Sequence, residues 1–195
     1  AGGLTDDVGR VGNPMDDLSR SARTVDDLVA QYGNNGSRIV REYGESVGGD
    51  ILRTYDSISD VAGANQLMDD LLSRSGSTRQ GALSELGHSA GLRRQGIELE
   101  SVGNMVNGRR GVDILTRDGR AIDVKDYNWG SGYYSNPTNV QNTADKMARQ
   151  AERFRNMYPG RQIEYAFTDL ANTPQVVIDA LEGAGARVTN VVWPN

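Results

Sequence analysis

Apolar residues after residue 79 recur with two different periods, which predict helices and strands in turn. Apolar residues three or four positions apart indicate one face of a helix, whereas alternation between turn residues indicates a strand. The helices are expected over residues 79–91, 140–158 and 173–183, the last capped by Thr173, and the strands over residues 96–106, 111–116, 120–127, 162–168 and 187–193. This order predicts an α/β (α+β) fold, in which an antiparallel hairpin continues into a mixed sheet with helices on its faces.

Residues 1–78 follow a different pattern, that of a small helical segment broken by glycine. Pairs of aspartates followed by an aliphatic residue recur at Asp6-Asp7, Asp16-Asp17, Asp26-Asp27 and Asp69-Asp70. We interpret each pair as the start of a helix, where acidic side chains complement the helix dipole; a calcium- or partner-binding role is the alternative. Thr24 and Asp27 have the spacing of a capping box. Breaks are expected at residues 12–14, 33–36 and 48–49, and a linker at residues 73–77.

Composition narrows the class of protein and its domain organisation. The chain has 195 residues, no cysteine and a single histidine, His88. It therefore lacks disulfides, thiolate metal sites and histidine-rich nuclease motifs, and a serine–histidine triad is disfavoured. No stretch approaches the roughly 20 apolar residues of a membrane span, and we expect no signal peptide within these residues. Because it begins at Ala1 without methionine, we expect the sequence to be a piece of a longer polypeptide.

Charge is distributed unevenly between two predicted regions. Residues 1–78, an acidic helical amino-terminal or linker region, carry 13 acidic and 7 basic side chains, a net charge of −6. Residues 79–195, in which the helices and strands of the sheet are predicted, carry 13 acidic and 14 basic side chains, a net charge of +1. An enzyme that acts on nucleic acid needs a basic binding face, which the second region can supply and the first is much less able to.

Lysine is scarce in this chain, and the position of one lysine points to chemistry. Arginine outnumbers lysine 19 to 2, so a lysine is not a routine surface charge here. Lys125 follows Asp123 by two positions on a predicted strand, and alternate residues of a strand share a face. We therefore expect Asp123 and Lys125 to project together, with Ile122 and Val124 on the opposite face.

Asp113 lies on the preceding predicted strand and joins this pair only if the connecting turn has the right length. A two-residue turn would set Asp113 on the wrong face. A three-residue turn at residues 117–119, with its glycine left-handed, would set it opposite Asp123. We predict the three-residue turn, because it also keeps Ile114 and Ile122 together on the apolar face.

Two adjacent carboxylates repel each other, and their pKa values rise unless a cation lies between them. Magnesium prefers hard oxygen ligands and keeps bound waters, one of which can become a nucleophile. A lysine beside that water would favour hydroxide and hold a phosphate. Glu85, on the preceding predicted helix, is a third acidic candidate for this site. The alternative is that it lies on a solvated surface of that helix. His88 shares its face and is interpreted as a bystander.

Basic residues supply candidate contacts to a phosphate backbone. The candidates are Lys146, Arg149, Gln150 and Arg153 on the long helix, and Arg109 and Arg110 before Asp113. For the helix, a solvated basic face is the alternative. The loop after Lys125 carries four aromatic residues, Tyr127, Trp129, Tyr133 and Tyr134. These aromatics would either stack on exposed bases or pack as a lid.

The set of Glu85, Asp113 and Asp123-Val124-Lys125 resembles the PD-(D/E)xK nuclease superfamily, which has the restriction-endonuclease-like fold. Residues 79–195 are most similar to the nuclease toxin domains at the carboxyl ends of bacterial polymorphic and contact-dependent toxins. Val112 stands where the superfamily motif has proline. The resemblance implies a Mg²⁺- or Mn²⁺-dependent endonuclease in which Asp113, Asp123 and Glu85 bind metal and Lys125 orients the attacking water. Gln150, or else Gln141, would match the glutamine that some members carry on the following helix.

The resemblance also implies a biological setting. Such toxins are secreted, act in the cytoplasm of a rival cell and are neutralised by a cognate immunity protein. Three alternatives stay open at this point: a DNA endonuclease, which is the commoner activity of the fold, a tRNA-cleaving nuclease, and a noncatalytic module that binds nucleic acid or a partner.

Overall fold

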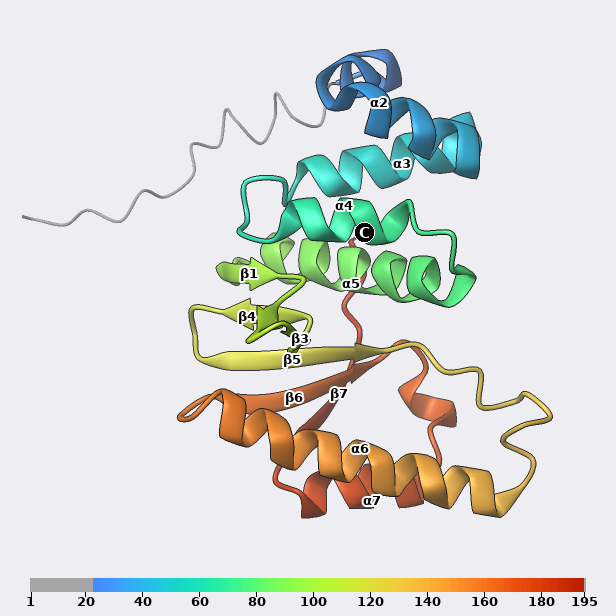
Figure 1. The fold of residues 1–195 in the computed structure, drawn as a ribbon, viewed down its shortest axis with the longest axis vertical. Helices are drawn as coiled ribbons and strands as arrows, with labels where there is room; N and C mark the ends of the chain where they lie inside the picture. Colours follow the sequence, from blue (N-terminus) through green and yellow to red (C-terminus); the bar gives the residue numbers. More distant parts are fainter. Residues whose placement is uncertain (1–22, 195) are drawn as a thin grey trace, which may run out of the picture.

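The computed structural model describes residues 23–194 and places a five-stranded mixed sheet between two sets of helices (Figure 1). The strands are β1 (Leu99–Val102), β4 (Ile114–Thr116), β5 (Arg120–Lys125), β6 (Gln162–Phe167) and β7 (Arg187–Asn190). They lie in the order β1-β4-β5-β6-β7, with antiparallel pairing from β1 to β5 and parallel pairing from β5 to β7. The predicted α/β class, an antiparallel hairpin that continues into a mixed sheet, is confirmed.

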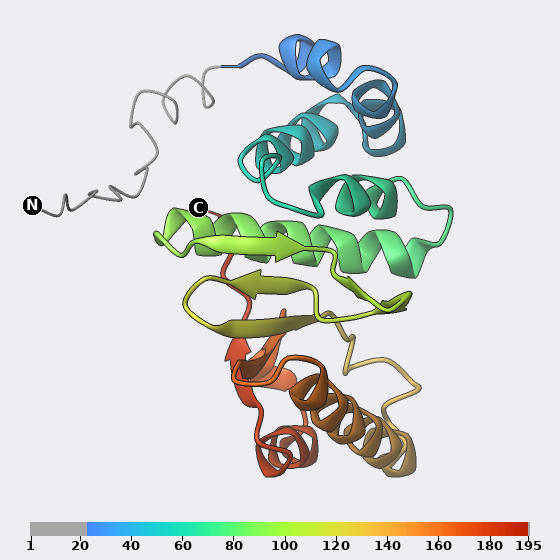
Figure 2. The ribbon, with the colours of Figure 1, turned by 60° about the vertical axis from the view of Figure 1, so that its left-hand side comes forward.

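Helices cover both faces of this sheet, and its central strands β4, β5 and β6 are largely buried between them (Figure 2). On one face lies α5 (Gly76–Arg94), with α2 (Val25–Tyr43), α3 (Glu45–Asp56) and α4 (Ala64–Leu71) beyond it. On the other face lie α6 (Pro137–Met157) and α7 (Gln175–Gly183), preceded by the short 3₁₀ turn η1 (Leu170–Asn172). In the part of the chain that the structure describes, no helix is both long and apolar enough to cross a membrane.

The alternation of β4 and β5 assigns their apolar residues to two separate cores. Ile114 and Ile122 enter the core shared with α2 to α5. Leu115 and Ala121 enter the core shared with α6 and α7. The stripe predicted on the long helix, Met147, Ala151, Phe154 and Tyr158, is buried in this second core, as expected.

Helix α5 is enclosed on nearly every side, because the other amino-terminal helices cover it and the last described residues cross it. It begins at Gly76 after the cap Ser75, three residues earlier than predicted. A Cβ atom added to Gly87 would lie 2.4 Å from the ring of Trp193, and one added to Gly91 would lie 2.1 Å from the carbonyl oxygen of Val192. The carboxyl-terminal segment therefore packs directly on the backbone of α5.

The amino-terminal helices confirm some of the predicted boundaries and correct others. The capping box of Thr24 and Asp27 is present, and the backbone of α2 is non-helical at Gly33 (φ 55°), where a break was predicted. The break predicted at residues 48–49 is wrong, because both glycines lie inside α3, and a Cβ on Gly48 would come within 2.8 Å of the α2 backbone. The aspartates at residues 6, 7, 16 and 17 and the break at 12–14 lie outside the described residues.

Of the predicted linker at residues 73–77, residues 73–75 belong to a short connection from α4 to α5, and residues 76–77 are wrong because they lie in the first turn of α5. The core is continuous across it, because Leu67 and Leu71 of α4 are buried with Leu86 of α5 and Ile122 of β5. The division of the chain at residue 78 stays a prediction. Asp69 and Asp70 lie at the end of α4 and not at a helix start, so that interpretation of the pair is wrong.

Two of the predicted strands and one cap also differ from the structure. The strand predicted over residues 96–106 divides at Gly103 (φ 59°), and β2 (Met105–Val106) pairs with β3 (Arg109–Arg110) in a separate small sheet. The strand predicted over residues 187–193 ends as β7 at Asn190. The cap of α7 is Pro174 and not Thr173, whose hydroxyl donates to the carbonyl of Asp169 at 2.9 Å.

Candidate active site

The hairpin of β4 and β5 sets the register of the candidate residues. Ile114 pairs with Ile122 and Leu115 with Ala121, which leaves residues 117–119 as the turn. Gly119 is left-handed (φ 92°), and its N–H donates to the carbonyl of Thr116 at 3.2 Å. The predicted three-residue turn is confirmed. One further step of this register places Asp113 opposite Asp123.

Asp113 is a buried carboxylate directly before β4, an inner strand of the sheet. Its Oδ2 accepts a hydrogen bond from the backbone N–H of Val124 at 2.7 Å, which ties it to the neighbouring strand. Its backbone carbonyl accepts from the N–H of Gly103 at 2.8 Å and from the side chain of Asn104 at 3.3 Å. Burial, and then the negative charge of Asp123, raise the pKa of Asp113 to about 7. The site therefore favours added positive charge at this position.

Asp123 and Lys125 project from the same face of β5, as predicted, and their side chains form an ion pair. This face lies toward α6 and α7, and the ammonium of Lys125 sits 5.6 Å from the centre of the Tyr165 ring. Burial alone would lower the pKa of Lys125, but the charges of Asp123 and Asp113 raise it above its ordinary value. Lys125 is therefore a cation in the folded protein, suited to orient water or phosphate oxygen.

Glu85 approaches from α5, on the opposite side of the sheet, and its side chain is buried. The alternative of a solvated helix surface is therefore wrong. Its Oε1 accepts a hydrogen bond from the N–H of Gly103 at 2.8 Å. Burial, and then the charge of Asp113, raise the pKa of Glu85 well above its ordinary value. His88, one turn further on, is also buried, and its Nδ1 accepts from the N–H of Val192 at 2.9 Å, which makes it a support for the carboxyl-terminal segment.

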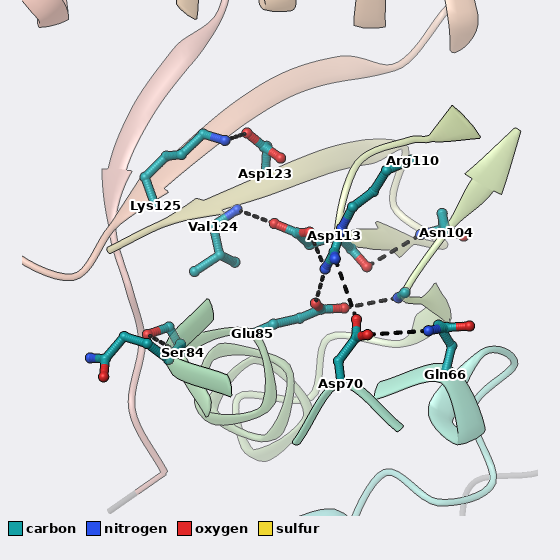
Figure 3. A network of polar contacts seen from close by, with 12 residues as sticks. Gln66, Asp70, Ser84, Glu85, Asn104, Arg110, Asp113, Asp123, Val124 and Lys125 are labelled. Atoms are coloured by element: carbon teal, nitrogen blue, oxygen red, sulfur yellow. Dashed lines mark hydrogen bonds and ion pairs between the residues drawn. The ribbon is translucent and has the colours of Figure 1, made fainter. Parts of the chain in front are cut away.

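Arg110 reaches from β3 into the middle of the acidic residues (Figure 3). Its Nη1 lies 3.3 Å from Oδ2 of Asp70, and its Nη2 lies 3.4 Å from Oε2 of Glu85 and 3.5 Å from Oδ1 of Asp113. Asp70, at the end of α4, also accepts a hydrogen bond from Gln66 at 3.2 Å. Asp70 is not among the predicted site residues, because its position in an aspartate pair resembles a helix start.

The remaining predicted binding residues lie away from this network. Lys146, Arg149 and Arg153 are exposed on α6, and Gln150 is half-buried beside them. Gln141 donates to Asp145 at 2.8 Å near the start of the same helix. Arg109 lies on β3, and its side chain is outside what the structure describes. In the aromatic loop, Trp129 is buried and stacks on Tyr127 with ring centres 5.0 Å apart. Only Tyr133 among its rings is largely exposed, so the loop is mostly a packed lid.

The donor chemistry fits a divalent cation for two of the three predicted ligands. Asp113 and Asp123 supply hard oxygen donors on adjacent strands, and the raised pKa of Asp113 indicates a deficit of positive charge there. Glu85 is kept from this pair by the Arg110 guanidinium, which lies between Glu85 and Asp113. Within residues 23–194, no three His, Cys, Asp or Glu side chains gather closely enough to hold one ion. A three-carboxylate ligand set would require Arg110 to move.

Comparisons with protein-family models, with curated proteins and with solved structures found no match to this chain.

Proposed function

We propose that the protein is a metal-dependent endonuclease of the PD-(D/E)xK type, which hydrolyses phosphodiester bonds in DNA. The observation that carries this proposal is the hairpin register, which sets buried Asp113 opposite Asp123 and keeps Lys125 on the face of Asp123. A carboxylate pair with an adjacent lysine ammonium is the arrangement needed to hold a cation, a water and a phosphate together.

In this mechanism Asp113 and Asp123 would hold Mg²⁺ or Mn²⁺, which would supply a bound water of lowered pKa and positive charge to offset that of the phosphate. The backbone N–H of Val124 fixes the orientation of Asp113 by its 2.7 Å hydrogen bond. The Lys125 ammonium, charged and held by Asp123, contacts a phosphate oxygen and orients the attacking water. The exposed basic side chains of Lys146, Arg149 and Arg153 on α6 contact the backbone of the nucleic acid.

The resemblance to secreted nuclease toxins supports a biological role for this activity. In that role the protein acts in the cytoplasm of a rival cell, and a cognate immunity protein blocks it. A noncatalytic nucleic-acid- or partner-binding module is the second candidate, and the specific observation that favours it is the Arg110 guanidinium between Glu85 and Asp113. A permanent arginine there would replace the metal.

Incubation of the purified protein with plasmid DNA and with total tRNA, in Mg²⁺ or Mn²⁺ and in chelator, tests the proposal. We expect cation-dependent cleavage of DNA, and a loss of at least about a hundredfold in Asp113→Asn and Lys125→Ala. Arg41→Ala, which removes an exposed positive charge on α2 far from the candidate site, is the control, and its nicking rate on plasmid should stay within severalfold of the unmodified protein. Cleavage of tRNA but not of DNA would indicate that the substrate is RNA. If neither polymer is cleaved, the nuclease proposal is wrong and the noncatalytic binding module is favoured.

A further inference from the structure

Arg110 is more exposed to solvent than the three carboxylates that it contacts, which belong to Asp70, Glu85 and Asp113. Its side chain is 52% exposed, whereas those of Glu85, Asp113 and Asp70 are 2%, 11% and 15% exposed. Each of its three contacts measures 3.3–3.5 Å, which is longer than the 2.7–2.9 Å typical of charge-assisted hydrogen bonds. The guanidinium is therefore shared among three carboxylates and optimally bound to none.

The two ends of the guanidinium serve different partners. Nη1 faces Asp70 of α4, while Nη2 faces Glu85 of α5 and Asp113 before β4. Nη2 can therefore leave Glu85 and Asp113 while Nη1 stays on Asp70. Gln66 holds the other oxygen of Asp70 at 3.2 Å, so this carboxylate is itself fixed in place.

The backbone that carries Arg110 is also suited to a small displacement. Arg110 lies on β3, a two-residue strand that pairs only with β2 in the structure of residues 23–194. The turn between them contains Asn107 (φ 50°) and Gly108 (φ 72°), and the hairpin joins the main sheet beside Gly103 and Gly111. Such a short hairpin has few interactions to break when its side chains move.

From this geometry we infer that Arg110 is an exchangeable internal cation: its Nη2 contacts Glu85 and Asp113, a divalent cation held by Asp113 and Asp123 displaces it from Asp113, and Asp70 retains it beside the site. Asp70 is then a positioning residue contributed by the amino-terminal helices. This inference rests on the proposed metal-dependent function. It assigns Arg110 and Asp70 opposite effects on metal affinity, because one competes with the metal and the other draws the competitor away.

Calorimetric titration of the nucleic-acid-free protein with Mn²⁺ measures these effects without reference to catalysis. We expect Arg110→Gln to bind Mn²⁺ at least about fivefold more tightly, the lower end of typical coupling between two binding events. We expect Asp70→Asn to bind Mn²⁺ more weakly, because Arg110 then settles on Glu85 and Asp113. The double variant should match Arg110→Gln, since Asp70 acts only through Arg110.

Asp69→Asn, at the exposed neighbour on α4, and Arg117→Gln, in the exposed hairpin turn, are matched controls that should leave the affinity unchanged. If Arg110→Gln does not fold, the sign of the change in Asp70→Asn decides the matter alone. Equal affinities in all folded variants, with intact Mn²⁺ binding and DNA cleavage in the unmodified protein, would overturn the exchange and leave the nuclease proposal standing. Absence of Mn²⁺ binding in every variant would overturn both.

Discussion

At the scale of single residues, the site concentrates buried charge that the fold compensates only in part. Asp113 and Glu85 both have pKa values raised by burial, and Arg110 and Lys125 supply the nearby positive charge. A group whose charged form is disfavoured in the folded state reduces stability at neutral pH. Active sites often carry such a cost because function requires the charge.

Replacing Asp113 should therefore stabilise the metal-free protein. Its carboxyl has a pKa of about 7 when folded and about 3.9 when unfolded, so the folded state binds more protons between these values and stability falls as the pH rises through that window. Asparagine removes the charge and keeps an oxygen that can accept from Val124. We expect Asp113→Asn to raise the melting temperature by at least about 2 °C at pH 8, and less at pH 5. Scanning calorimetry in chelator measures this, with Asp179→Asn, at an exposed residue of α7, as the control; a lower melting temperature at pH 8 would contradict it.

His88 should give the folding stability a pH dependence of the opposite sign to that of Asp113, with stability lost as the pH falls. Burial lowers the pKa of His88 to about 4, against about 6.5 when unfolded, so the unfolded state binds more protons between these values. Stability from neutral His88 is therefore lost as the pH falls from about 6.5 toward 4. We expect the unmodified protein to lose about 2 kcal/mol more free energy of unfolding than His88→Asn between pH 7 and pH 5. Urea titrations at each pH test this, and parallel losses in the two proteins would refute it.

At the scale of elements, α5 connects the helical layer, the sheet and the carboxyl-terminal segment. A helix on the surface of a globular protein normally has one apolar face. Helix α5 is enclosed by other segments, so it needs small side chains on several faces. Its glycines meet this demand where Val192 and Trp193 cross it. Glu85 lies on the same helix, so the packing of α5 also fixes the position of a candidate ligand.

Two glycines of α5 should respond in opposite ways to alanine. In Gly91→Ala the new Cβ would lie 2.1 Å from the carbonyl oxygen of Val192, so we expect a loss of about 1–3 kcal/mol of unfolding free energy. At Gly81, exposed on the same helix, nothing lies within 4 Å of an added Cβ. There we expect a gain of up to about 1 kcal/mol from helix propensity. Chemical denaturation of both variants tests the pair, and equal effects would contradict the enclosed position of α5.

At the scale of the whole molecule, the amino-terminal helices and the sheet share one core. Leu67 of α4 is fully buried in that core, and the carbonyl of Ala62 accepts a hydrogen bond from the N–H of Val102 in β1 at 2.8 Å. Asp70 adds a contact from the same helices to the candidate site. We therefore expect residues 23–194 to unfold as one cooperative unit.

The two tryptophans, both beyond residue 78, can report this cooperativity. Leu67→Ala should cost about 2–5 kcal/mol through the cavity that it leaves. Tryptophan fluorescence, from Trp129 and Trp193, and helical circular dichroism should shift to the same lower denaturant midpoint. An early circular dichroism transition with unchanged fluorescence would instead support independent folding of the two predicted regions.

The features that could be predicted from the sequence are those that depend on residues close together along the chain. The hairpin register followed from Gly119 and the pairing of Ile114 with Ile122, and the capping box from Thr24 and Asp27. The missed features depend on contacts between distant segments. The glycines at 48–49 resemble a break locally, yet they permit close packing of two helices, and Asp70 meets Arg110 only in the folded molecule. No local pattern distinguishes these cases.

The three-residue turn at residues 117–119 also bears on the order of events during folding. Asp113 directly precedes β4, and Asp123 lies on β5. These two strands are joined by the shortest connection in the main sheet, and hairpins of this kind close within microseconds. Strand β6, which brings Tyr165 beside Asp123, joins β5 only after the long crossover through α6, and such distant pairings form more slowly. We therefore expect the two carboxylates to meet while water still screens their repulsion, and to lose that water only when β6 and its helices arrive.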